Sequence, residues 1–167
     1  MVDLKNNPMF IKELINVRPN IEAWVNTYTT NCYAYALGLD VPESDICKNA
    51  YYIVGTLGGF VSDTYTFVLP NIMSRLELDL KYLELEYEFV NPYSNIKENE
   101  WLIAVFSNIH NDSDFHFLRK DFENYWTHKP GWRRNPCNYD SEMQIIKDID
   151  NAKFYCYKYE KCLKLHK

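Results

Sequence analysis

Residues 101–106 read WLIAVF, an apolar run without a charged residue. Apolar side chains on both faces indicate a strand that is covered on both sides, as at the centre of a sheet. A membrane-spanning helix needs ~20 apolar residues, and no run in the chain approaches that length. The sequence therefore predicts a central strand over 101–106 and no membrane span.

Segments on both sides of this run predict further strands. They are LELEYEFV (83–90), DFHFLR (114–119), NYWTHK (124–129) and KFYCYKY (153–159). In the first, glutamates alternate with apolar and aromatic residues, which is typical of a half-buried strand with Leu83, Leu85, Tyr87 and Phe89 on its inner face. The segments DFHFLR and NYWTHK follow each other closely enough to form a hairpin. We expect an antiparallel sheet of about five strands.

The residues before this sheet predict helices, over 8–16, over 32–37, and from 62 or 63 to about 81. Thr30 or Asn31 can cap the second helix, because their side-chain oxygens accept hydrogen bonds from its first backbone amides. Gly38 is suited to end it. N-terminal helices packed on an antiparallel sheet define an α+β fold. At 167 residues, with no linker or repeat, the chain is expected to form a single domain, 1–167.

Composition limits the function classes. The formal net charge of −5 argues against a nucleic-acid-binding protein. Five cysteines without regular spacing do not resemble the framework of a disulfide-rich secreted protein. The first residues, MVDLKNNPMF, lack the hydrophobic core of a signal peptide, so a cytoplasmic protein is expected. Secretion by another route or delivery to a host stays open, and the oligomeric state is not determined by the sequence.

A thiol stands at the predicted start of the helix over 32–37, in the stretch TTNCYAYALG (29–38). The positive end of the helix dipole favours the thiolate form of Cys32 there. A nucleophilic thiol also needs a base within hydrogen-bond reach, itself oriented by a third polar group. His116 is the candidate base, since it lies on a predicted strand and shares a sheet face with Asp114 and Leu118.

His128 is the candidate third group, 12 residues after His116 (128 − 116 = 12). A hairpin that pairs Arg119 with Tyr125 also pairs the two histidines directly. Opposed residues of an antiparallel pair point to one face, with Cβ atoms ~4.5–5.5 Å apart. The first imidazole would then face Cys32 and the second would orient the first. A slip of one residue would turn His128 to the other face.

This order of motifs resembles the NlpC/P60 branch of the papain-like cysteine hydrolases. The resemblance extends over about residues 24–131, from NCYAYAL through WLIAVF and DFHFLR to YWTHKPG. It implies Cys32 as the nucleophile, His116 as the general base and His128 as the orienting residue. NCYAYAL differs from the family's DCSGL-like box, so the resemblance leaves the class of substrate open.

The same resemblance implies residues that contact substrate. Asn31 stands where the family often has an aspartate before the cysteine. The family's tyrosine near the oxyanion site has Tyr28 or Trp24 as its candidate counterpart. These three residues are therefore expected to bind substrate.

The resemblance implies a thiol-dependent hydrolase, a cysteine peptidase or amidase, that needs no cofactor or metal. It would cleave an amide bond of a peptide or protein through an acyl-thioester on Cys32. Acyltransferase or transglutaminase-type transfer on the same residues is one alternative, and a catalytically inactive binding module of the same fold is another. A zinc site made by Cys32, His116 and His128 is a third. Metal content and thiol alkylation separate these possibilities.

Other polar residues are predicted to lie outside the site. Cys137 is interpreted as a loop cysteine, and GTLGG (55–59) as a flexible turn rather than a phosphate-binding loop. A local basic cluster is expected to form a solvated rim; it consists of Arg119, Lys120, Lys129, Arg133 and Arg134.

Overall fold

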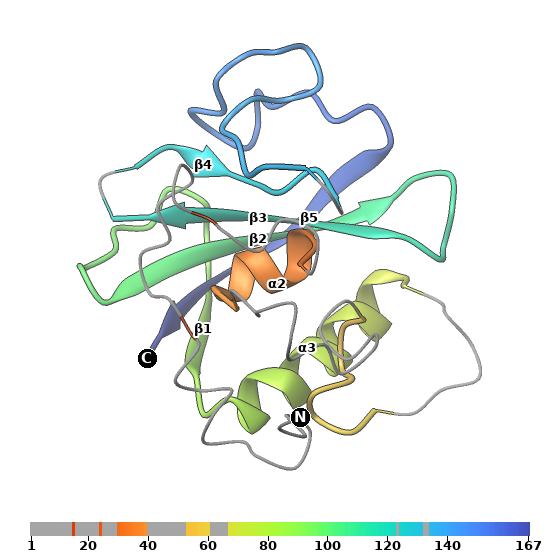
Figure 1. The fold of residues 1–167 in the computed structure, drawn as a ribbon, viewed down its shortest axis with the longest axis vertical. Coiled ribbons are helices and arrows are strands. Elements are labelled where there is room, and N and C mark those ends of the chain that lie inside the picture. The colour runs from red at the N-terminus through yellow and green to blue at the C-terminus, as the bar shows by residue number, and fades with distance from the viewer. Residues whose placement is uncertain are drawn as a thin grey trace.

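The structure is a computed structural model that describes residues 15, 24, 30–39, 53–60, 67–122, 124–131 and 134–167. In this part of the chain, two helices accompany an open, five-stranded antiparallel sheet (Figure 1). The helices are α2 (Cys32–Leu37) and α3 (Leu69–Tyr82). The strands are β1 (Glu86–Val90), β2 (Glu100–Asn108), β3 (Phe115–Asp121), β4 (Trp126–Thr127) and β5 (Tyr157–His166). The predicted α+β class and antiparallel sheet are confirmed.

Strand β2 lies at the centre of the sheet, whose order is β1-β5-β2-β3-β4. All of residues 101–106 are buried, as predicted. Because successive side chains of a strand point to opposite faces, β2 contributes to two cores. Trp101, Ile103 and Val105 join a first core with residues of α2 and α3. Leu102, Ala104 and Phe106 join a second core, which the C-terminal loops complete through Ile146 and Ile149.

The edge strand β1 is shorter than the predicted strand over 83–90. Leu83 caps the end of α3 and Glu84 has φ 53, so extended backbone begins only at Glu86. The predicted inner face is also wrong in part. Leu83 and Leu85 are buried, but Tyr87 and Phe89 are 38% and 54% exposed at the edge of the sheet.

The last two strands differ more from the prediction. Strand β5 begins at Tyr157 rather than at 153, and Phe154 instead packs against the second core. Charged residues dominate the exposed positions of β5, and Lys164 pairs across the strands with Glu88 of β1 at 2.6 Å. Strand β4 is confined to Trp126–Thr127 within the predicted 124–129, and the next residue, His128, forms a β-bridge with Cys137 instead.

Helix α2 has the predicted bounds. The Asn31 side chain caps it, and Gly38 ends it at φ 79, in the left-handed region that suits glycine. Helix α3 begins at Leu69 rather than at 62 or 63, with Pro70 in its first turn, while residues 61–66 lie outside the described part. The predicted helix over 8–16 also lies outside it except for Ile15, which forms a β-bridge with Leu39.

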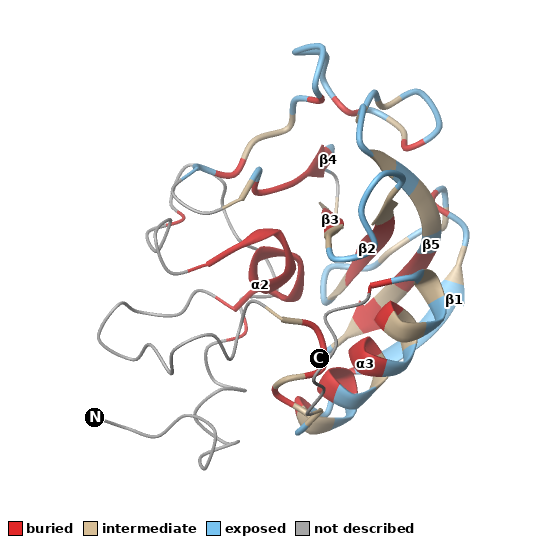
Figure 2. Ribbon diagram, turned by 90° about the vertical axis from the view of Figure 1, so that its right-hand side faces the viewer, coloured by how far each residue is buried: buried red, intermediate tan, exposed pale blue. Residues whose placement is uncertain are grey.

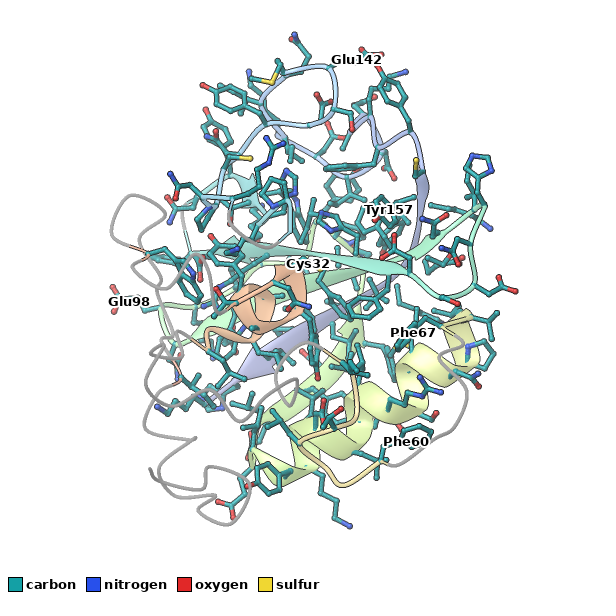
Figure 3. All side chains as sticks on the ribbon, turned by 45° about the vertical axis from the view of Figure 1, so that its right-hand side comes forward. Cys32, Phe60, Phe67, Glu98, Glu142 and Tyr157 are labelled. Carbon is teal, nitrogen blue, oxygen red and sulfur yellow. The ribbon has the colours of Figure 1, made fainter. Side chains whose placement is uncertain are left out.

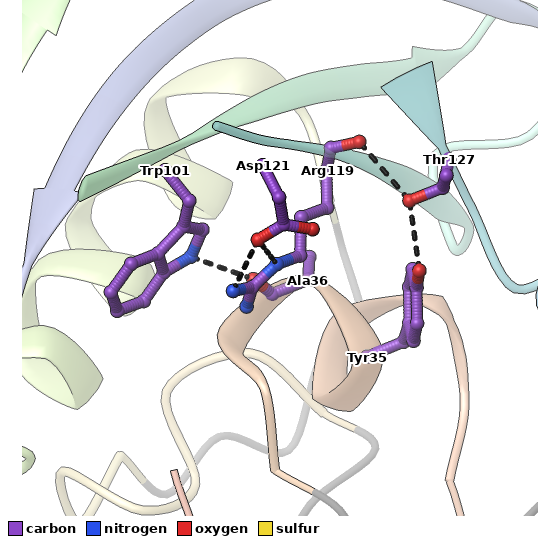
Figure 4. Close-up of polar contacts among 6 residues, drawn as sticks. All are labelled: Tyr35, Ala36, Trp101, Arg119, Asp121 and Thr127. Atoms are coloured by element: carbon purple, nitrogen blue, oxygen red, sulfur yellow. Dashed lines mark hydrogen bonds and ion pairs between the residues drawn. The ribbon is translucent and has the colours of Figure 1, made fainter. Parts of the chain in front are cut away.

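Every residue of α2 is buried, whereas α3 buries only the side that faces the sheet (Figure 2). The α2 backbone is tied to the sheet through the carbonyl oxygen of Ala36 (Figure 4). That oxygen accepts from Trp101 Nε1 at 3.1 Å and from Arg119 Nη1 at 3.2 Å. The Arg119 guanidinium is fully buried and pairs with Asp121 at 2.7 Å. The predicted solvated rim is therefore wrong for Arg119.

Asp79 of α3 joins α2 to the turn over 53–60. Its carboxylate accepts hydrogen bonds from the Tyr33 hydroxyl, from Gly55 N at 2.6 Å and from Gly58 N at 2.7 Å. A Cβ atom on Gly58 would lie 2.6 Å from the Leu78 carbonyl oxygen, so only glycine allows this approach. The GTLGG segment is thus a packed turn held on α3, and the predicted flexible turn is wrong.

Replacing Asp79 by alanine is expected to lower the free energy of unfolding by at least about 3 kcal/mol. The reason is that each buried donor left without an acceptor costs roughly 1–3 kcal/mol. Urea denaturation measures the loss, and Asp112→Ala, at an exposed aspartate, serves as the matched control, expected to change stability by less than about 0.5 kcal/mol. Equal effects of the two variants would show that Asp79 does not hold these elements together.

Candidate active site

Cys32 is the first residue of α2 and lies beside β3 (Figure 3). Its side chain is 6% exposed and lines a cavity of about 160 Å³, here called the Cys32 cavity. The other walls of this cavity include Asn31, Asp114, His116, Pro130 and Tyr157. The thiol is therefore nearly enclosed, and the cavity is the space through which it meets other groups.

Burial raises the pKa of Cys32 to about 12. Hydrogen bonds from the backbone N–H groups of Phe117 and Tyr33, and the charge of Lys129, lower the pKa but do not offset the loss of solvent. Helix α2 has only six residues. The sequence-based expectation of a thiolate is therefore wrong for this state, and Cys32 needs a base to become a nucleophile.

The two predicted histidines are hydrogen-bonded to each other. His116 on β3 and His128 after β4 place Nε2 and Nδ1 2.9 Å apart. The strand register differs from the predicted one, because Arg119 pairs with Thr127 rather than with Tyr125. A shift of two residues keeps every side chain on its face. His116 and His128 therefore meet as diagonal neighbours, not as a directly opposed pair.

The partners of the His128 ring define the tautomers of both histidines. His128 Nε2 lies 2.7 Å from the Tyr139 carbonyl oxygen, which can only accept, so Nε2 carries a proton. Burial lowers the pKa of His128, so the ring is neutral and its Nδ1 is an acceptor. His116 then donates from Nε2, and burial, assisted by His128, keeps its pKa well below 6.5. The lone pair of His116 lies on Nδ1.

The Cys32 cavity lies where the edge of β3 is uncovered. Strand β4 pairs only with Arg119 and Lys120, so it stops short of His116. Cys32 belongs to the first core, whereas the His116 ring contacts Phe154 and Tyr157 beside the second core. Cys32 and the His116 ring therefore lie on opposite faces of the sheet. They line one cavity, and no hydrogen bond joins them in the described residues.

Two residues that the sequence did not assign to the site orient His116. The Tyr157 ring stacks on the imidazole, with centroids 5.1 Å apart and planes 30° apart. The Tyr157 hydroxyl donates to Asp114 Oδ2 at 2.6 Å, and Asn108 Nδ2 donates to the same oxygen at 3.0 Å. Asp114 was predicted to share a sheet face with His116, whereas Tyr157 falls where the last strand was misplaced.

Lys129 also lies in surroundings that differ from the predicted ones. It was predicted on a solvated rim, yet it is fully buried, and its Nζ donates to the Gly131 carbonyl oxygen at 2.5 Å. Burial lowers the pKa of Lys129 to about 8, and a negative charge on Cys32 would act in the opposite direction. Lys129 in turn is one of the groups that lower the pKa of the Cys32 thiol.

Two of the three predicted substrate-binding residues lie in the described part of the chain. Asn31 lines the Cys32 cavity, but its Oδ1 accepts from Tyr33 N at 3.1 Å and Ala34 N at 3.0 Å as a helix cap. Trp24 is buried; its Nε1 donates to Thr30 Oγ1 at 3.0 Å, and it is not among the residues that line the cavity. Tyr28 lies outside the described residues.

A larger hollow, here called the aromatic pocket, adjoins the histidines. It has a volume of about 480 Å³. Its walls include His116, His128, Pro130, Cys137, Tyr139, Met143, Phe154, Tyr155 and Tyr157. Cys137, predicted to be a plain loop cysteine, has its Sγ 3.5 Å from His128 Nε2. The second core and the C-terminal loops thus supply a pocket on the far side of the base from Cys32.

Three further findings are negative. In the ranges that the structure describes, no group of three or more His, Cys, Asp or Glu side chains is arranged to hold a metal ion. None of the described helices is long and apolar enough to span a membrane. Comparison with protein-family models, with curated proteins and with solved structures gave no match.

The lowered pKa values of His116 and His128 predict a pH dependence of stability. The unfolded chain binds protons at histidine below about pH 6.5, whereas these buried rings resist protonation, so the two histidines should lower the free energy of unfolding as the pH drops below 6.5, while Asp79, whose pKa burial raises to about 6, acts in the opposite direction. The slope per histidine is at most about 1.4 kcal/mol per pH unit. Urea denaturation between pH 7.5 and 5.5 measures it.

His116→Phe keeps an aromatic ring and removes one titrating group, so its stability should depend less steeply on pH. Ile109→Phe, at an exposed position without a titrating side chain, is the control and should retain the wild-type slope. A wild-type slope in the His116 variant would contradict the buried, neutral histidine.

Proposed function

We propose that the protein is a thiol-dependent hydrolase of the cysteine peptidase or amidase type, with an NlpC/P60-like, papain-like catalytic centre. The observation that carries the proposal is the hydrogen-bond chain from the Tyr139 carbonyl through His128 to His116. This chain leaves an unprotonated nitrogen on a histidine that lines the same cavity as Cys32. A thiol, a base and a group that orients the base are what nucleophilic catalysis requires.

Acylation would begin when His116 Nδ1 takes the thiol proton and Cys32 Sγ attacks the carbonyl carbon of an amide. The C–N bond breaks, the proton passes from His116 to the departing nitrogen, and an amine leaves. Water then gives a proton to the same nitrogen of His116 and attacks the thioester carbon. When the C–S bond breaks, the proton returns to sulfur and a carboxylic acid is released. An amine in place of water would give transfer instead of hydrolysis.

Two groups would stabilise the negative charge that forms in these steps. The backbone N–H of Cys32, at the start of α2, is suited to bind the oxyanion of the tetrahedral intermediate. The Lys129 ammonium is buried close enough to Cys32 to influence the thiol, and it is the cation that would offset the developing thiolate. A buried cation is costly without a negative partner, and a transient thiolate would supply one.

The surroundings of Cys32 favour the inactive binding module as the second candidate. Cys32 is 6% exposed, its pKa is raised to about 12, and no hydrogen bond joins it to His116 in the part described. Catalytic hydrogen bonds are often loose until substrate binds, so this geometry is compatible with an enzyme at rest. Acetylation of the protein by p-nitrophenyl acetate separates the two, since only an active thiol at Cys32 would be acylated and then turn over.

Variants of the three residues are expected to have graded effects on that turnover. Cys32→Ala should abolish it, and His116→Ala should lower it by at least about 100-fold, because the thiol proton then has no acceptor. His128→Ala should retain intermediate activity, because His128 only fixes the orientation and tautomer of His116. Release of p-nitrophenolate and mapping of the acetylated residue by mass spectrometry provide the measurements.

Cys156→Ala is the control for background labelling, because Cys156 is exposed and lies on the wall of the aromatic pocket. It should remove background labelling and leave Cys32 open to acetylation. Turnover that survives in Cys32→Ala would reject the proposed nucleophile.

Lys129→Met is expected to slow acetylation of Cys32 at pH 7, because it removes a charge that lowers the pKa of the thiol. Lys129→Arg should restore part of the rate. Since the pKa of Lys129 is about 8, the wild-type rate constant should also lose this assistance above pH 8, and the methionine variant should not. Replacing a buried charge by an apolar side chain is often neutral for stability, so urea denaturation distinguishes a loss of rate from a loss of fold. An unchanged rate in Lys129→Met would reject the electrostatic role.

A further inference from the structure

The aromatic pocket takes no part in the acylation steps described above. Its volume of about 480 Å³ is three times the 160 Å³ of the Cys32 cavity. Its walls include Tyr139, Met143, Phe154 and Tyr155, and most of their exposed area is apolar. A hollow of this size and lining can hold a group as large as an aromatic ring.

The position of the pocket relative to His116 decides which half of a substrate reaches it. His116, Pro130 and Tyr157 form a wall common to the pocket and the Cys32 cavity. His116 gives its proton to the departing nitrogen, so that nitrogen must come within hydrogen-bond reach of the ring. The acyl half stays on Cys32. The departing half therefore lies on the His116 side of the scissile bond, next to the aromatic pocket.

Hydrogen bonds within the chain hold the loop that forms the outer wall of the pocket. The buried Asp140 accepts from the backbone N–H of Glu142 and of Gln144 at 2.9 Å each, and from Lys153 N at 3.0 Å. Tyr139 and Ile145 form a β-bridge across the same loop. Contacts within the chain therefore hold the shape of this wall, and such preorganisation reduces the entropy lost on binding.

We propose that the aromatic pocket binds the leaving-group half of the substrate and favours a bulky apolar side chain next to the departing nitrogen. This inference rests on the proposed function and narrows its substrate class to amides of bulky apolar amines, such as a peptide bond that precedes an aromatic or long aliphatic residue. Since bond formation retraces bond cleavage, an incoming amine of the same kind occupies the same pocket. Its nitrogen attacks the thioester carbon, an amide forms, the C–S bond breaks, and the amine proton passes through His116 to sulfur.

A competition between two amines tests the pocket without knowledge of the natural substrate. p-Nitrophenyl acetate first acetylates Cys32, and the acetyl-enzyme then reacts with an equimolar mixture of phenylalanine amide and glycine amide. Mass spectrometry measures the ratio of the two N-acetylated products. We expect an excess of the phenylalanine product by about tenfold or more, because burial of one aromatic side chain provides a preference of that order.

A pair of variants localises the effect. Ser141→Trp, at an exposed position on the pocket wall, is expected to reduce the ratio towards the ratio of the amines reacting with a free acetyl thioester. Ser113→Trp, at an exposed position in the turn between β2 and β3 and away from the pocket, should leave both turnover and ratio unchanged. Thermal unfolding confirms that both variants fold.

The outcomes separate the two proposals. If Cys32 is acetylated and turns over but the two amines react equally, or Ser141→Trp keeps the wild-type ratio, the pocket assignment is overturned and the hydrolase proposal stands. If Cys32 is never acetylated, the hydrolase proposal fails, and the pocket assignment fails with it. A strong preference for phenylalanine amide that is lost in Ser141→Trp alone supports both.

Discussion

The carbonyl oxygen of Ala36 connects the helical layer to the sheet. It accepts one hydrogen bond from Trp101 of the central strand and one from Arg119 of β3, and both donors are fully buried. Four carbonyl groups at the end of any helix lack partners within the helix, and here the sheet supplies donors to one of them. Because α2 has only six residues, a fixed last turn also fixes the first. The position of Cys32 therefore depends on a contact made at the other end of its helix.

On the opposite side of the sheet, hydrogen bonds orient the His116 ring. A backbone carbonyl has no proton to give, so Tyr139 determines which nitrogen of His128 is protonated, and His128 determines the same for His116. The backbone carbonyl of Tyr139 thus determines the direction of donation in this series of hydrogen bonds. A side chain at position 139 matters less for this role than the conformation of its loop, which Asp140 holds.

The sequence predicted those features that depend on local patterns. The continuous apolar run of β2, the cap at Asn31 and the stop at Gly38 follow from hydrophobicity and turn chemistry, and all are observed. The common face of His116 and His128 was predictable because side chains alternate with a period of two, so a register error of two residues did no harm.

The features that the sequence did not predict depend on contacts between distant segments. Lys129 and Arg119 look like surface residues by type, and only the packing of α2 and the C-terminal loops around them makes them buried. Strand β5 was misplaced because charged side chains pair with neighbouring strands and dilute the apolar signal. Tyr157 reaches His116 from a strand 41 residues later in the chain (157 − 116 = 41), which no local pattern reports.

Because β4 ends early, part of the edge of β3 stays uncovered. Since Arg119 pairs with Thr127, continuation of the same register would place residue 130 opposite His116 (119 + 127 − 116 = 130). That residue is Pro130, which has no N–H to add to the ladder, and Gly131 follows with φ 119. A strand without this interruption would cover the edge of β3 and separate a thiol on one face from an imidazole on the other. Pro130 thus keeps open a cavity that Cys32 and His116 line together, and the proposed proton transfer would take place there.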